Sequence, residues 1–224
     1  MDFATLMKTR WSCRGYRPDE VPEEMLTRVL ATAQRTGSWC NVQPWHVRLL
    51  RGEATRWLAR ELTAHVSSHP DAADQTPDLE LPGTYAGVHL ERRREAGYAL
   101  YRSLGIERTD HAARAAAMLD NYSFFGAPVA LIVTVERSQG AYAAADCGAF
   151  VANLMNAALD EGLGTIAQGA LGVYAGKVRE LLEIPEHEAV LCGVALGYPD
   201  EEHPSNGFRT ERASLSDIVT EVRR

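Results

Sequence analysis

Gly37-Ser-Trp-Cys-Asn-Val-Gln-Pro-Trp45 is the stretch on which the interpretation of this chain depends. It carries two tryptophans, two side-chain amides and a hydroxyl. An indole is large and apolar, with one N–H that needs a partner when buried, and each amide supplies an acceptor and two donors. This combination suits a flat aromatic ligand rich in heteroatoms. A loop that tryptophans staple against the core explains the same residues, so the stretch alone leaves both interpretations open.

The residues on either side of this loop predict a helix before it and a short strand after it. Apolar residues recur at helical spacing through the preceding segment, which is expected to end near Thr36-Gly37. The members of this stripe are Met25, Leu26, Val29, Leu30 and Ala33. Residues 46–50 are expected to form the strand. The loop therefore joins two regular elements.

Two apolar segments further along predict the core. Val129-Ala-Leu-Ile-Val-Thr-Val135 is a continuous apolar run, which is typical of a strand covered on both faces. Residues 143–159 are apolar almost all round, which indicates a helix central to the core or to a subunit interface. Other strands are expected at 165–167 and 190–196. Helices and strands mix without a strict βαβ rhythm, so the predicted fold class is α+β.

Residues 67–120 are expected to form an insertion or lid within a single domain that spans residues 1–224. The segment begins with a polar, proline-containing stretch and continues into helices expected at 91–104 and 112–119. The first of these helices carries the charge run Glu91-Arg-Arg-Arg-Glu95. Long irregular segments inside compact domains are often functional.

Composition excludes several classes of function. The net charge of −7 argues against a nucleic-acid partner, because such binding depends on Lys and Arg contacts to phosphates. The four cysteines lie far apart without a CxxC pair, so neither a zinc site nor a disulfide framework is expected and a cytoplasmic location fits. No apolar run is long enough to span a membrane. The GxSxG, Walker A and GxGxxG motifs do not occur in the sequence.

Two short arginine-containing segments lie at opposite ends of the chain. Arg10, Ser12 and Arg14 place two guanidiniums and a hydroxyl within five residues, and Arg209 and Arg212 repeat the pattern near the C-terminus. Arginine binds phosphate through paired N–H groups, although solvated surface charges explain the same pattern. The sequence does not decide whether the two segments converge.

Four motifs together resemble the FMN-dependent nitroreductase family. They are Arg10-Trp-Ser-Cys-Arg14, Ser38-Trp-Cys-Asn-Val-Gln-Pro-Trp45, Gly162-Leu-Gly-Thr with Gln168-Gly169, and Gly197-Tyr-Pro with Asn206 and Arg209-Thr-Glu-Arg212. They occur in the family's order across nearly the whole chain. The resemblance implies a central, mostly antiparallel sheet flanked by helices, and an interlocked homodimer with two FMN sites at the subunit interface.

The resemblance also implies roles for particular residues. The cofactor-binding residues at the chain ends are Arg10, Trp11, Ser12, Arg14, Arg209 and Arg212, whose arginines and serine would hold the phosphate and ribityl chain. The loop residues Ser38, Trp39, Asn41 and Gln43 would approach the flavin, some of them in the partner subunit. The Gln168 and Gly169 backbone would lie near flavin N5, and Asn121 would contact the polar edge of the ring.

The chemistry implied is ping-pong hydride transfer from NAD(P)H through flavin N5 to a nitroaromatic or quinone-like acceptor, without a catalytic side chain of the protein. Position and residue type suggest Tyr85, Arg92, Tyr98 and Phe124 as the wall of the acceptor pocket. The sequence departs from the family by Gly37-Ser38 in place of Pro-Ser and by the lack of a lysine in 120–125. The alternatives are a deiodinase-like reductive dehalogenase or other specialised flavin enzyme, and a flavin-storing protein with little turnover.

Overall fold

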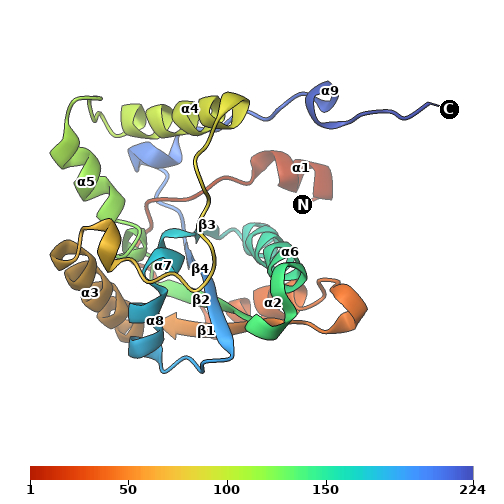
Figure 1. The fold of residues 1–224 in the computed structure, drawn as a ribbon, viewed down its shortest axis with the longest axis horizontal. Coiled ribbons are helices and arrows are strands. Elements are labelled where there is room, and N and C mark those ends of the chain that lie inside the picture. Colours follow the sequence, from red (N-terminus) through yellow and green to blue (C-terminus); the bar gives the residue numbers. More distant parts are fainter. Residues whose placement is uncertain (224) are drawn as a thin grey trace.

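A four-stranded antiparallel sheet forms the centre of the computed structural model, which describes residues 1–223 (Figure 1). The strand order is β1-β2-β4-β3, and each neighbouring pair is antiparallel. The bounds are Trp45–Arg51 for β1, Val129–Glu136 for β2, Gly164–Gln168 for β3 and Glu188–Gly197 for β4. The sheet and its helices confirm the predicted α+β class.

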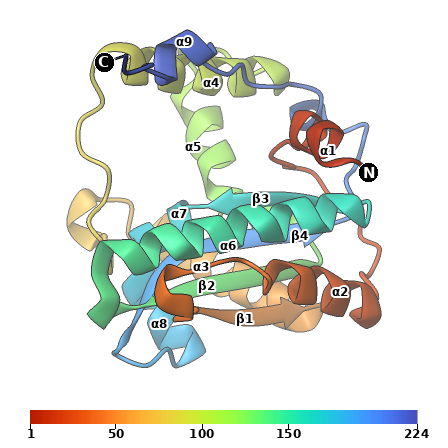
Figure 2. The same cartoon turned by 90° about the vertical axis from the view of Figure 1, so that its right-hand side faces the viewer.

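Helices cover both faces of the sheet (Figures 1 and 2). On one face lie α2 (Glu23–Ala33) and α6 (Gly140–Asp160), and on the other lie α3 (Glu53–Ser68), α7 (Ala170–Val173) and α8 (Ala175–Leu182). Every residue of β2 from 129 to 135 is buried, as the continuous apolar run predicted. The long helix α6 buries its inward face against the sheet, which confirms its central position.

A further group of helices lies beyond the β3 edge of the sheet (Figure 2). It contains α1 (Phe3–Thr9), α4 (Gly87–Ser103) and α9 (Leu215–Ile218), and α5 (His111–Leu119) connects α4 back to the sheet. The helices α4, α5 and α9 bury none of their residues fully. Within residues 1–223, no helix is both long enough and apolar enough to cross a bilayer.

Two predicted helix boundaries need correction. The helix α2 ends at Ala33 rather than near Thr36, because the Thr36 hydroxyl donates back to the Ala33 carbonyl (2.7 Å) and closes the last turn. The helix α4 begins at Gly87 rather than at residue 91, since the hydrogen bond from Leu90 N to Ala86 O already closes a helical turn there.

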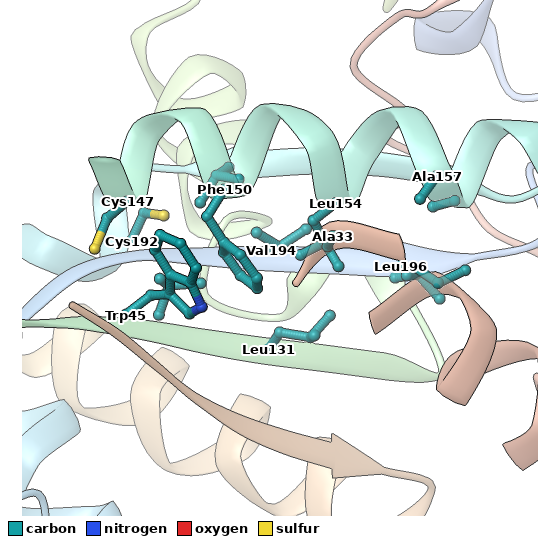
Figure 3. Close-up of a cluster of buried hydrophobic side chains, with 14 of the residues drawn as sticks. Ala33, Trp45, Leu131, Cys147, Phe150, Leu154, Ala157, Cys192, Val194 and Leu196 are labelled. Atoms are coloured by element: carbon teal, nitrogen blue, oxygen red, sulfur yellow. The ribbon is translucent and has the colours of Figure 1, made fainter. Parts of the chain in front are cut away.

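The core between α6 and the sheet contains one of the two loop tryptophans (Figure 3). Trp45 is buried and stacks on Phe150 of α6 with a centroid separation of 5.0 Å and an interplanar angle of 16°. Its indole N–H donates to Gln34 Oε1 (2.9 Å), so the polar atom is satisfied. The stapled-loop interpretation is therefore correct for Trp45.

Phe124 belongs to the second core, on the opposite face of the sheet. Its side chain is fully buried in a cluster with Leu58 and Leu62 of α3, and its backbone has a positive φ of 54°. A side chain without exposed surface cannot line an open pocket, so the structure corrects the expectation that Phe124 forms part of the acceptor wall. Phe124 lies in the turn Phe124–Gly126 directly before β2, and it is the buried residue of that turn.

We expect Phe124→Ala to lower the free energy of unfolding by about 3–5 kcal/mol, because truncation of a buried phenylalanine leaves a cavity. Urea unfolding followed by circular dichroism measures this loss. Tyr85→Ala, at an exposed aromatic, is the control and should change stability by no more than about 0.5 kcal/mol. A loss below about 1 kcal/mol for Phe124→Ala would contradict the core position.

The buried carboxylate of Glu188 connects β1, β2 and β4 at the end of the sheet where β4 begins. The Glu188 carboxylate accepts hydrogen bonds from Arg48 Nη1 (2.5 Å), Arg48 Nη2 (3.1 Å) and the Thr134 hydroxyl. Burial alone would raise the pKa of Glu188, but the hydrogen bonds from Arg48 and Thr134 outweigh it and lower the pKa to about 2. The Glu188 side chain is only 6% exposed, so solvent screens this interaction weakly.

This lowered pKa gives folding a specific acid dependence. The stabilisation from Glu188 is complete above its ordinary pKa of 4.5 and is lost as the pH falls through about 2. We expect this group to contribute about 3 kcal/mol to the fall in unfolding free energy over that range. Urea unfolding from pH 6 to pH 2 should show a shallower fall for Glu188→Gln than for wild type. An identical slope would contradict the assignment, and Glu61→Gln, at an exposed position, is the control.

The chain between α3 and α4 is fastened to the sheet by one aspartate. Asp78 forms ion pairs with Arg137 and Arg179, and its Oδ2 accepts from the backbone N–H of Val190 (2.9 Å). Thr76 adds backbone hydrogen bonds to Val173 and Gly176. The polar segment after residue 67 is therefore anchored at residues 76–78, although its expected role as a lid stays a prediction.

Candidate functional site

The two arginine-containing segments meet in the structure. Residues 10–14 run beside β3, where Cys13 N donates to Thr165 O (3.0 Å). Residues 208–212 lie across them, and a cavity of about 360 Å³ opens between these segments and Ala96 of α4. Trp11 and Ser12 line the cavity together with a set of cationic side chains. These are Lys8, Arg10, Arg14, Arg209 and Arg212.

The arginines of this cavity make no ion pair with any carboxylate in the part of the chain that the structure describes. Burial, and then the charge of neighbouring Arg212, lower the pKa of Arg10, and burial also lowers the pKa of Arg14. Both shifts mark positive charge that is unfavourable in the isolated chain. An anion with several oxygens would relieve it through charge-assisted hydrogen bonds.

Aromatic rings hold two of these guanidiniums in place. The Arg209 guanidinium lies 4.8 Å from the centroid of Trp11, and that of Arg14 lies 5.7 Å from the centroid of Phe208. Each of these guanidiniums also donates from Nη1 to a backbone carbonyl, and its remaining N–H groups can donate to a ligand. Trp11 Nε1 is itself buried without a hydrogen-bond partner. This unsatisfied donor beside an uncompensated positive cluster fits a phosphorylated ligand.

Gln168 and Gly169, at the C-terminal end of β3, form the second predicted part of the site. The Gln168 side chain is buried, and its Nε2 donates to the backbone carbonyl of Asn121, while Oε1 has no partner. The structure thus brings Asn121 and Gln168 together. Beside them, a Cβ built on Gly169 would meet no atom within 4 Å, so the Gly169 backbone borders open space that a flat ligand could approach.

The loop of residues 38–43 is held in an unusual conformation. Cys40, Asn41 and Gln43 have positive φ angles of 47°, 58° and 48°. Such a backbone costs on the order of 1–3 kcal/mol per residue and tends to occur at functional sites. The Ser38 hydroxyl accepts from Gln43 N (3.0 Å), and Gln43 Nε2 donates to Asn41 O and Oδ1 (3.2 Å each). Trp39 remains 59% exposed, and its ring lies 4.7 Å from that of Tyr142 in a tilted arrangement, with an interplanar angle of 52°.

The structure does not bring this loop and the arginines together within one chain. Trp39 N donates to Asp146 near the start of α6, whereas the amino group of Met1 pairs with Asp160 at its end. These aspartates are fourteen residues apart on the helix, which corresponds to about 21 Å. In Figure 2 the segment 37–43 and α1 lie at opposite ends of α6. The loop and the arginines therefore do not line one site within a single chain.

The residues expected to line the acceptor pocket separate in the structure. Tyr85 is exposed, with the guanidinium of Arg93 5.3 Å from its ring. Arg92 faces the C-terminal tail across a cavity of about 320 Å³. Tyr98 instead borders a cavity of about 300 Å³ between α4 and α5, on a different face of α4.

The sequence did not identify several residues of these cavities. Phe208 lies beneath Arg14, and Arg108 and Arg114 lie over Tyr98 and Tyr101. The only signal for Phe208 in the sequence is its position next to Arg209. Nothing in the sequence links residues 98 and 101 to residues 108 and 114.

The fold and the cavity define an α+β protein with a cationic site suited to a phosphorylated planar ligand. The sequence model described as the Nitroreductase family matches residues 7–198, and the chain belongs to this family. It is 35% identical to a 4-nitrobenzoate reductase of Nocardioides sp. (strain LMS-CY), covering 97% of this chain and 89% of that protein. It is also 35% identical to nitroreductase NfnB of Mycolicibacterium smegmatis, covering 96% and 90%.

Solved structures agree with this membership. The FMN and NADPH-dependent nitroreductase NfnB from sphigopyxis sp. strain HMH superposes with a TM-score of 0.95 at 29% identity, over 100% of both chains. The FMN-dependent nitroreductase NfnB from Mycobacterium smegmatis, solved in complex with NADPH, superposes with a TM-score of 0.92 at 33% identity, over 99% of this chain and 100% of that one. The match extends over α4, α5 and the C-terminal tail.

Proposed function

We propose that this protein is an FMN-dependent oxidoreductase that uses NAD(P)H to reduce nitroaromatic or quinone-like acceptors. The observation that carries the proposal is the convergence of Arg10, Arg14, Arg209 and Arg212 on one cavity, where they pair with no carboxylate of residues 1–223. Family membership supports it, as do relatives whose names specify FMN, NADPH and nitrobenzoate. Such a cluster is suited to a phosphate, which can accept several charge-assisted hydrogen bonds from arginines.

Bound FMN would supply the hydride-carrying chemistry between NAD(P)H and the acceptor. The protein's part is binding and orientation. The arginines and Ser12 would hold the phosphate and ribityl chain, and the Trp11 N–H would gain the partner that it lacks. The backbone at Gln168 and Gly169, which the Gln168–Asn121 hydrogen bond holds in place, would border the reactive edge of the ring. No nucleophilic side chain is required.

The segment 67–120 is proposed to shape the acceptor site as part of a single domain. Tyr85, Arg92 and Tyr98 remain its candidate wall residues, and Phe124 supports this region from the core instead. Because Asp78 fastens the beginning of the segment while α4 and α5 bury no residue fully, these helices are the more adaptable part. Cys13, Cys40, Cys147 and Cys192 are free thiols, which favours the reducing cytoplasm as the location.

An absorption spectrum of the purified protein and a coupled assay test this function. We expect bound FMN to colour the protein yellow, and we expect NADH or NADPH to be oxidised when 4-nitrobenzoate is added. Riboflavin should bind more weakly, because it lacks the phosphate. A protein that stays colourless and does not bind added FMN would contradict the proposal. FMN binding without turnover of nitroarenes, quinones or halotyrosine would favour a storage role, whereas turnover of halotyrosine alone would favour a dehalogenase.

A homodimer is proposed to complete the site. Asp146, which contacts the loop of residues 38–43, lies about 21 Å along α6 from Asp160, which contacts the N-terminus of the segment that leads to Arg10, so a partner packed antiparallel on α6 would bring its loop toward this chain's cavity. The outer face of α6 is exposed and, apart from Tyr142 and Asn153, carries small residues that allow close helix approach. These are Ala141, Ala145, Gly148, Ala149 and Ala152. The exposed apolar side chains of α9, Leu215 and Ile218, would also gain cover.

Subunit complementation tests this arrangement. One variant, Arg209→Ala/Arg212→Ala, lacks the phosphate end, and a second, Trp39→Ala/Asn41→Gly, lacks the loop side chains while tolerating the positive φ at residue 41. Each alone should bind FMN poorly. Refolding them as an equal mixture should restore about a quarter of the wild-type FMN occupancy, since half of the dimers then contain one complete site. Absence of restoration in a dimeric mixture would contradict a shared site.

A further inference from the structure

One buried amide connects the two arginine-containing segments. Asn206 ends the 3₁₀ turn Pro204–Asn206 and is only 7% exposed. Its Oδ1 accepts from the backbone N–H of Arg14 (2.8 Å), and its Nδ2 donates to the carbonyls of Gly15 and Asp200 (2.8 Å each). The side chain thereby uses both of its N–H donors and its acceptor, and it ties the C-terminal segment to the N-terminal one.

The backbone of the same residue holds an arginine of the cavity. The carbonyl oxygen of Asn206 accepts from Arg209 Nη1 (2.7 Å), while its N–H donates to the carbonyl of His203 (2.9 Å). Asn206 therefore fixes the backbone of Arg14 through its side chain and the guanidinium of Arg209 through its main chain. Both arginines line this cavity, and within the described part of the chain neither pairs with a carboxylate.

The two segments also approach each other closely at Gly15. A Cβ built on Gly15 would lie 2.2 Å from Cγ of His203, so a larger residue would push the C-terminal segment away. The hydrogen bonds from Asp200 N to Gly15 O (3.0 Å) and from the Ser205 hydroxyl to Arg14 O (3.4 Å) flank the Asn206 amide. This contact region sets the distance between the two groups of arginines.

We propose that Asn206 is a positioning residue for the phosphate of FMN. The inference rests on the proposed function and adds to it the residue that assembles the phosphate site. Guanidiniums that share a cavity repel one another, so the free chain needs a tie that does not neutralise them. An amide meets this requirement, because it supplies two donors and an acceptor without a charge that would compete with the phosphate. An aspartate at this position would lose both donors to the carbonyls of Gly15 and Asp200 and would add a negative charge beside the cavity.

The test compares FMN with riboflavin, which differ only in the phosphate. Fluorescence titration of the apoprotein gives both dissociation constants for wild type, Asn206→Ala and Asn206→Asp. We expect Asn206→Ala to weaken FMN binding at least about tenfold while riboflavin binding changes less than about twofold, which lowers the ratio of the two affinities. Asn206→Asp should lower that ratio at least as far, because its carboxylate cannot donate to the carbonyls of Gly15 and Asp200 and adds a negative charge beside the phosphate site.

A purely structural role gives a different pattern. It would weaken the binding of FMN and of riboflavin in parallel in both Asn206 variants. Thr134→Val is the matched control, because it removes a buried hydrogen bond at the far end of the sheet and should leave the affinity ratio unchanged. A parallel loss, an unchanged ratio in both Asn206 variants, or failure of both variants to fold would overturn the positioning role.

The same titration separates this inference from the proposed function. Wild-type protein that binds neither flavin would refute the flavin site and, with it, the role of Asn206. Wild-type protein that prefers FMN over riboflavin, together with variants that keep the full preference, would refute only the role of Asn206. Loss of preference in the variants with retained riboflavin binding supports both.

Discussion

The site depends on like charges that the fold holds together without neutralising them. Arg10 and Arg14 come from the chain that enters beside β3, and Arg209 and Arg212 come from the chain that leaves after β4. Their positions are maintained by neutral contacts: rings beneath two guanidiniums and one buried amide between the segments. Such an arrangement is costly in the free chain and favourable once an anion arrives, which is the electrostatic pattern expected of a binding site.

The length of α6 imposes the second constraint. The contact of the strained loop at Asp146 and the contact of the N-terminus at Asp160 lie about two thirds of the helix apart, so one chain offers two incomplete walls. A second copy related by a twofold axis would supply each missing wall to the other, and the small residues on the outer face of α6 would permit the close contact. On this account the loop keeps its positive φ angles because they present Trp39 and Asn41 outward, where a partner's ligand would lie.

Periodicity predicted the parts of the fold that burial alone determines. The apolar run 129–135 is a strand covered on both faces, and the apolar helix near Phe150 lies at the centre of the structure. The α+β class followed from the same patterns. The sequence could not distinguish the buried Trp45 from the exposed Trp39. Trp45 contacts Gln34 and Phe150, and both of these partners come from other elements. For the same reason Phe124 was expected in a pocket and lies in the core.

The candidate site was likewise predictable in its residue types but not in its tertiary contacts. Residue types identified the arginines, the amide loop and Gln168, but their convergence required the tertiary contacts of Asn206 and Gly15. A crystal structure of the protein with FMN tests the central claim most directly. The account predicts that a single phosphate group accepts hydrogen bonds from at least one arginine of residues 10–14 and from Arg209 or Arg212 of the same chain. A phosphate bound by only one of the two segments, or bound outside this cavity, would contradict it.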